Sequence, residues 1–185
     1  MELPVVNMAV ASRHAGRAER TARRRSLTVD VAIVCSAFGA LAHFVATPSH
    51  YTWWPAAGAF FVVLGVAQSA CAVALLRGAR APWFVLAGIW GTVGVILVYV
   101  ASRTVGLPME PPVPFHGGRW VPGRSVVPDG AKYVGPLDIV TLAAEILVVI
   151  TLLTMLPKAL KDRAVNRLLW IGVLLWGAGI VGFVW

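Results

Sequence analysis

Two carboxyl groups and three threonine hydroxyl groups lie inside an otherwise apolar segment near residues 137–156. Asp138, Thr141 and Glu145 are spaced so that an α-helix would present all three on one face. Hydrocarbon cannot solvate a carboxyl group, so we expect this face to point into a helix bundle. Glu145 then needs either a proton or a cationic partner. Asp138 follows a Gly-Pro-Leu sequence, and an acid at that position is also typical of a helix start.

A basic residue that can serve as the partner ends the preceding apolar segment. Thr92, Tyr99 and Arg103 share one helical face, and Arg103 lies at its outer end. We expect its guanidinium group to pair with Asp138 and, through Tyr99 or water, to approach Glu145. The alternative is that Arg103 extends to the lipid headgroups and contacts neither acid.

Two histidines and two tryptophans lie where the first apolar segment ends. His43 falls on the predicted last helical turn, partly inside the bundle, and His50 falls in the short connection that follows. Trp53 and Trp54 stand where aromatic side chains anchor a protein at the membrane interface. Two histidines with one or two carboxylates could hold a metal ion, which makes His43 and His50 the metal-ligand candidates. Their seven-residue spacing crosses the predicted helix end, however, and is not that of a helical ligand pair.

The other polar groups of the apolar segments predict packing. Gln68 lies just past the middle of its segment, where an amide is expected to bond across a helix interface, and it joins the candidate pocket residues on that ground. Cys35 and Cys71 are expected to be free thiols. The sequence contains no Walker loop, no G-x-S-x-G elbow and no H-E-x-x-H or C-x-x-C motif. An enzyme of the soluble type is therefore not expected, and the sequence leaves the cofactor unknown, with none strongly implied.

The composition of the whole chain is that of a membrane protein. Of its 185 residues 58% are hydrophobic and 13% are charged, whereas about a quarter of a soluble domain is charged. Five apolar segments reach the ~20 helical residues that cross a hydrocarbon core. The sequence predicts a basic, disordered tail over residues 1–27 and an all-α bundle of five transmembrane helices over residues 28–185. The spans are predicted near residues 28–46, 56–76, 83–102, 137–156 and 168–185.

The distribution of basic residues predicts the orientation of these spans. Twelve of the 16 Lys and Arg residues lie in the tail and in the connections after the second and fourth spans. The other four are Arg103, Arg119, Arg124 and Lys132. We therefore expect a multi-pass protein of the bacterial inner membrane with a cytoplasmic N-terminus and an extracytoplasmic C-terminus. The net charge of +8 then reflects topology and not nucleic-acid binding. Lipid is the expected partner, and a second copy or another membrane protein is the alternative.

Two further segments admit alternatives. Residues 103–136 contain seven prolines and six glycines, and they predict an extended outer loop that is either solvated or a lid over the outer face. Arg-rich residues 13–25, followed by an apolar core and an A-x-A sequence at residues 40–42, imitate a cleavable signal peptide. Asp30 interrupts that core, so we expect the first span to be retained. Met8 is an alternative start.

The polar residues also form a recognisable combination. It consists of His43, His50 and Trp54, then Phe60, Phe61 and Gln68, then the sequence SRTVGLP at residues 102–108, then GPLD at residues 135–138, and finally Glu145. This combination, over residues 28–150, resembles small uncharacterised integral membrane proteins common in high-GC actinobacteria. The resemblance implies no established activity.

Three functions are compatible with these patterns. The first is a binding or transport protein with an outward-facing polar pocket for a metal ion, a proton or a small polar molecule. The second is a non-catalytic accessory or assembly subunit of a membrane complex, in which the polar residues fix helix packing. The third is a small membrane oxidoreductase that uses a quinone or a metal. The predicted pocket residues are His43, His50, Gln68, Tyr99, Arg103, Asp138 and Glu145.

Overall fold

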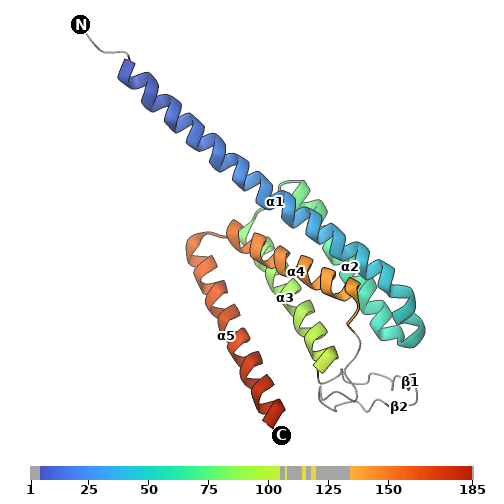
Figure 1. Cartoon of the computed structure of the whole chain (residues 1–185). Coiled ribbons are helices and arrows are strands. Elements are labelled where there is room, and N and C mark those ends of the chain that lie inside the picture. The colour runs from blue at the N-terminus through green and yellow to red at the C-terminus, as the bar shows by residue number, and fades with distance from the viewer. Residues whose placement is uncertain (1–4, 105–106, 108–113, 116–117, 120–133, 185) are drawn as a thin grey trace.

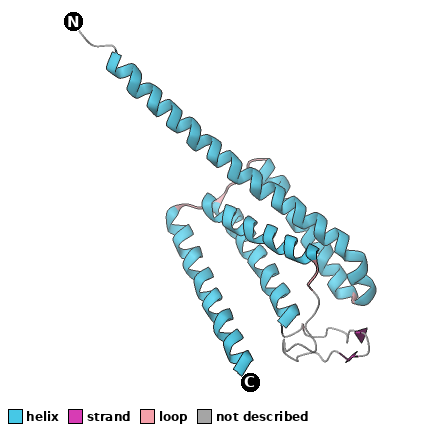
Figure 2. Ribbon diagram, viewed as in Figure 1, coloured by secondary structure: helices cyan, strands magenta, loops and turns pink. Residues whose placement is uncertain are grey.

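The structure is a computed structural model of the whole chain. It describes the backbone of residues 5–104, 107, 114–115, 118–119 and 134–184, and the side chains of residues 27–52, 54–103, 107 and 134–177. Apart from one pair of two-residue strands, the described elements are helices (Figure 2). Their order is α1 (Val5–Trp53), α2 (Pro55–Leu76), α3 (Pro82–Thr104), β1 (Pro114–Phe115), β2 (Gly118–Arg119), α4 (Pro136–Met155) and α5 (Lys158–Val184).

Four of these helices are long and apolar enough to cross a membrane, as expected of a multi-pass membrane protein. The prediction of an all-helical membrane bundle is confirmed at this level. The fifth predicted span, residues 168–185, ends among residues whose side chains are not described, and it stays a prediction. The four spans are Leu27–Thr52, Pro55–Leu76, Pro82–Arg103 and Pro136–Met155.

Helix α1 is longer at both ends than the sequence indicated. It begins at Val5, within the tail that we had predicted to be disordered, and its N-terminal part projects away from the other helices (Figure 1). The tail is rich in Ala, Arg and Glu, which are good helix formers. At the other end α1 continues past Pro48 to Trp53, so His50 is a helical residue and not part of a connection.

Side chains support this last part of α1, where Pro48 has no N–H to donate. The hydroxyl group of Thr47 donates to the carbonyl oxygen of His43 at 2.9 Å. The carbonyl oxygen of Ala46 accepts the ring Nδ1–H of His50 at 2.8 Å and the hydroxyl group of Ser49 at 2.9 Å. These bonds within the last turns explain why the helix passes the proline.

The connection between α2 and α3 has a helix-ending motif that fixes its path. Gly78 has φ +87°, a value that favours glycine. Its N–H donates to the carbonyl oxygen of Leu75 at 3.0 Å, and the N–H of Ala79 donates to that of Ala74 at 2.9 Å. This is the Schellman pattern of a helix C-terminus. It returns the chain into α3 within five residues, Arg77 to Ala81.

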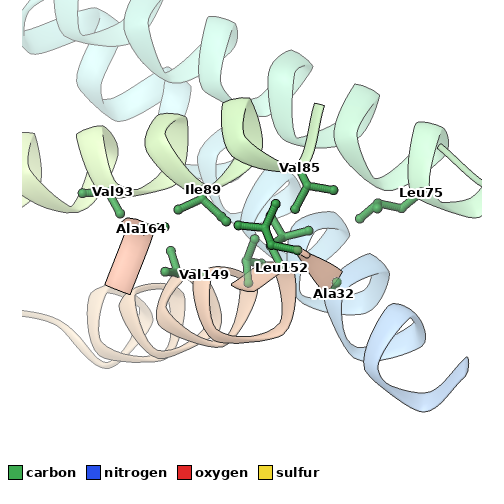
Figure 3. Packing of buried hydrophobic residues seen from close by; sticks show 10 residues of the cluster. Ala32, Leu75, Val85, Ile89, Val93, Val149, Leu152 and Ala164 are labelled. Carbon is green, nitrogen blue, oxygen red and sulfur yellow. The ribbon is translucent and has the colours of Figure 1, made fainter. Parts of the chain in front are cut away.

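The hydrophobic core lies at one end of the bundle. Leu75 at the end of α2, Val85 and Ile89 near the start of α3, and Leu152 near the end of α4 are almost completely buried (Figure 3). Ala32 of α1 and Ala164 of α5 also belong to this cluster. Tight packing of apolar side chains therefore closes the end of the bundle at which α2 meets α3 and α4 meets α5.

Candidate functional site

The most buried ion pair among the described residues joins α1 to α4. His43 Nε2 and Glu145 Oε1 are 3.1 Å apart, and their side chains are only 7% and 5% exposed. The pair is possible because α1 packs along α4 over the turns that carry these two residues. One proton must lie between the two atoms, since both are otherwise acceptors. The pair marks the boundary between the apolar core and the opposite end of the bundle.

Gln68 connects α2 to the same network, which then joins three helices. Its side-chain amide donates to Glu145 Oε1 at 3.3 Å. A Cβ atom at Gly39 would lie 2.5 Å from Gln68 Oε1, so the amide would have to shift if this position of α1 carried a side chain. Gln68 Oε1 is buried and has no hydrogen-bond partner among the described residues. The bond across a helix interface that the sequence predicted for Gln68 is present.

A second ion pair joins the last turn of α3 to the first turn of α4. Arg103 Nη2 donates to Asp138 Oδ2 at 3.2 Å, and the same oxygen accepts the backbone N–H of Gly135 at 3.0 Å. Asp138 therefore both caps the start of α4 and holds the guanidinium group. The guanidinium carbon also lies 5.2 Å from the centre of the Tyr99 ring, in a cation–π arrangement. Of the two partners that the sequence offered to Arg103, the structure places Asp138 in contact.

Both histidines contact the same aromatic ring. The ring centre of Phe61 is 4.3 Å from that of His50 and 5.4 Å from that of His43. Nδ1 of His50 carries a proton, because it donates to a backbone carbonyl group. Across the described part of the chain, no three His, Cys, Asp or Glu side chains are grouped so that they could hold a metal ion. The structure therefore does not bring His43 and His50 together as metal ligands.

These groups surround one cavity of about 520 Å³, with α1 and α2 on one side and α3 and α4 on the other. Six of the seven predicted pocket residues line it, and the seventh, Gln68, contacts the lining residue Glu145. Most of the remaining lining is apolar. The polar lining residues are His43, His50, Tyr99, Ser102, Arg103, Asp138, Thr141 and Glu145.

Glu145 offers an unused acceptor to this cavity. Its Oε1 atom accepts the bonds from His43 and Gln68, whereas Oε2 makes no hydrogen bond within the described residues. The residue is 4% exposed and lines the cavity. A carboxylate oxygen without a protein partner inside a membrane span is costly, and a ligand that donates a proton or carries positive charge would satisfy it.

Two features of the site were not predicted from the sequence. The first is the pairing of His43 with Glu145, because we had offered only Arg103 as a cation for the acids. The second is the aromatic lining from α2, in which Phe61 contacts both histidines. A signal for the pairing was present, since His43 and Glu145 are the only His and Glu within the predicted spans. Ionisable residues at that depth usually pair with one another.

Comparisons with known proteins found no related protein. No protein-family model matches the chain, and neither a curated protein nor a solved structure matches it significantly.

Proposed function

We propose that this protein binds a small molecule in a cavity that opens toward the outer face of a bacterial inner membrane, as part of a binding or transport process. The observation that carries the proposal is the buried His43–Glu145 pair at the floor of a cavity, with an unused carboxylate oxygen facing it. Ionisable groups within membrane spans are costly and commonly mark ligand or proton pathways.

The size of the cavity favours a small molecule over a metal ion. Pockets for drug-sized ligands measure roughly 300–1,000 Å³, and about 520 Å³ falls within this range. Most of the lining is apolar, and the polar groups lie at two levels. Asp138 and Glu145 are seven residues apart on α4, which corresponds to about 10 Å along a helix axis. A ligand with an apolar body and a polar group at its inner end matches this arrangement.

The direction of opening rests on charge and packing. The closed apolar core lies at the end that carries Arg77, Arg80 and the basic start of α5, which the distribution of basic residues makes cytoplasmic. Lys158 at this end hydrogen-bonds to Asp162 at 2.7 Å, a contact that raises the pKa of the amine and keeps it charged. The cavity lies at the opposite end, where α3 ends and α4 begins, and therefore opens outward.

The accessory-subunit function has one observation in its favour. The side chains of His43, Gln68 and Glu145 join α1, α2 and α4 by hydrogen bonds, so they could serve only to fix the packing of these helices. In that case the fold requires the polar network. In a binding protein, ligand binding requires the network and the fold does not. The two functions therefore differ in what an apolar replacement of the network does to stability.

Thiol labelling in intact cells tests the proposed function. Thr141 lines the cavity between the two ion pairs, so Thr141→Cys, made in a protein with Cys35→Ala and Cys71→Ala, should react with a membrane-impermeant methanethiosulfonate added outside. Val63→Cys is the control, because Val63 is 64% exposed on α2, outside the cavity lining, and should face lipid. Labelling of position 141 from outside, with position 63 unlabelled, is the expected result. Labelling of position 141 from the cytoplasmic side alone, or from neither side, overturns the proposal.

A further inference from the structure

The charges around the cavity identify what can enter it. The ionisable side chains that line the cavity come from three helices, and α2 contributes only aromatic, apolar and amide groups. They are His43 and His50 from α1, Tyr99 and Arg103 from α3, and Asp138 and Glu145 from α4. Arg103 and Asp138 neutralise each other at 3.2 Å. Among the described residues, His43 is the one hydrogen-bond partner of Glu145 that can become cationic.

Without a ligand, the His43–Glu145 pair therefore holds one exchangeable proton. A carboxylate that is 4% exposed inside a membrane span needs a positive charge or a proton of its own. Gln68 is neutral and cannot supply either one. The proton resides on the His43–Glu145 pair, as imidazolium with carboxylate or as imidazole with carboxylic acid.

Resting on the proposed function, we infer that the ligand is an aromatic or otherwise lipophilic organic cation, and that its charge replaces this proton. Glu145 Oε2 supplies the negative charge, and it has no other partner in the described part of the chain. The rings of Trp54, Phe60, Phe61 and Tyr99 line the same cavity, and aromatic faces attract cations where water is excluded. An apolar cavity with a carboxylate at its floor and aromatic walls is suited to such a ligand.

An anion fits the site less well. Its natural partner would be Arg103, which already holds Asp138 and lies over Tyr99. An anionic group that reached the cavity floor would also meet the carboxylate of Glu145. A neutral ligand would use the apolar lining and would leave the proton on the His43–Glu145 pair.

The exchange is balanced in charge and in protons. One monovalent cation enters, one proton leaves the pair for the solvent, and Glu145 remains a carboxylate with neutral His43 beside it. Binding of a permanent cation should then become tighter as the pH rises. The dependence approaches tenfold per pH unit while the pair still holds its proton.

Three probes of matched shape test the inference on the purified full-length protein. They are benzyltrimethylammonium, its uncharged isostere neopentylbenzene, and the anion benzylsulfonate, each titrated calorimetrically in weakly buffered detergent solution with a pH indicator. The cation should bind with release of close to one proton. The neutral isostere should bind at least about tenfold more weakly, without proton release. The anion should bind no better than the neutral compound.

Glu145→Gln keeps the size of the side chain and one acceptor oxygen and removes the charge, so it should abolish cation binding and proton release. Asp30→Asn is the matched control, because Asp30 is an exposed carboxylate outside the cavity lining and its loss should change neither. If Glu145→Gln does not fold, proton release by the parent protein decides. The inference is overturned if the neutral or anionic probe binds as tightly as the cation, if the cation binds without proton release, or if no probe binds. The thiol labelling of Thr141→Cys tests the proposed function independently of these binding experiments.

Discussion

Glu145 shows how a buried carboxyl group is accommodated when the nearest arginine is used elsewhere. The sequence predicted that Glu145 faces the bundle, because helical spacing fixes which residues share a face with Asp138 and Thr141. The identity of its partner could not follow from spacing within one helix, because it depends on how α1 packs against α4. The contact of Arg103 with Asp138 was predictable, since both residues end their helices on the same side.

The Arg103–Asp138 pair leads to a first prediction. Arg103→Ala leaves Asp138 without its cation and should lower the free energy of unfolding by on the order of 1 kcal/mol, because both side chains are partly exposed. Adding Asp138→Asn should restore part of this loss, since an Asn oxygen can still accept the N–H of Gly135. Adding Glu145→Gln instead should not. The melting temperature in detergent measures each effect, and rescue by Glu145→Gln rather than Asp138→Asn would contradict the pairing.

The fit of Gly39 against Gln68 gives a second prediction. In Gly39→Ala the new methyl group occupies the place of Gln68 Oε1, so the amide must turn away and lose its bond to Glu145. Gly39→Ala should therefore melt below the parent protein. Gln68→Ala in the same chain should recover stability relative to Gly39→Ala, because the space is then free. Equal melting temperatures for Gly39→Ala and the parent would show that the contact is not tight.

At the scale of the helices, the sequence predicted which helices form more reliably than where each helix ends. The positions of α2, α3 and α4 follow from apolar length and from a proline at the start of each helix. The end of α1 could not be predicted, because Pro48 normally ends a helix and the bonds that carry α1 past it come from side chains of its own last turns. The result moved His50 into the helix and onto the cavity wall.

The close approach of α1 and α2 carries the third prediction. A Cβ atom at Gly58 would lie 2.5 Å from the Cα atom of Tyr51, so the backbones themselves would have to separate. Gly58→Ala should destabilise the protein by about 1–3 kcal/mol, the usual cost of overpacking. Gly91→Ala is the control, because no other group of the described residues lies within 4 Å of its added Cβ atom, apart from its own helix, and alanine favours helix by up to about 1 kcal/mol. A Gly58→Ala protein that melts like Gly91→Ala would refute the close contact.

At the scale of the whole molecule, one end of the bundle is filled and the other is hollow. The core from Ala32 to Ala164 closes the end at which α4 meets α5 (Figure 3). The cavity occupies the opposite end, where its lining includes the last turns of α3 and the first turns of α4. The sequence showed which residues are apolar but not where helices would stay apart, since that depends on the relative positions of four helices. The cavity could therefore be expected only as a set of polar residues and not as a space.

Topology is the prediction at this scale. Reporter fusions after Arg80 and after Asp162 should read as cytoplasmic, because Lys and Arg are concentrated in the connections that hold these residues. Fusions after Trp120 and at the C-terminus should read as extracytoplasmic. A cytoplasmic reading at the C-terminus would remove the fifth span, and inverted readings throughout would make the cavity open inward.

The central claim is that the His43–Glu145 pair serves a ligand and is not required for the fold. Its most direct test is the thermal unfolding of the double variant His43→Leu/Glu145→Leu, which replaces the pair by apolar side chains of similar size. Such replacements of buried ion pairs are often neutral or stabilise a protein by about 1–4 kcal/mol. The double variant should therefore melt at or above the melting temperature of the parent protein, while it no longer binds benzyltrimethylammonium. A double variant that fails to fold, or that melts well below the parent, would contradict the claim and would favour a role in helix packing.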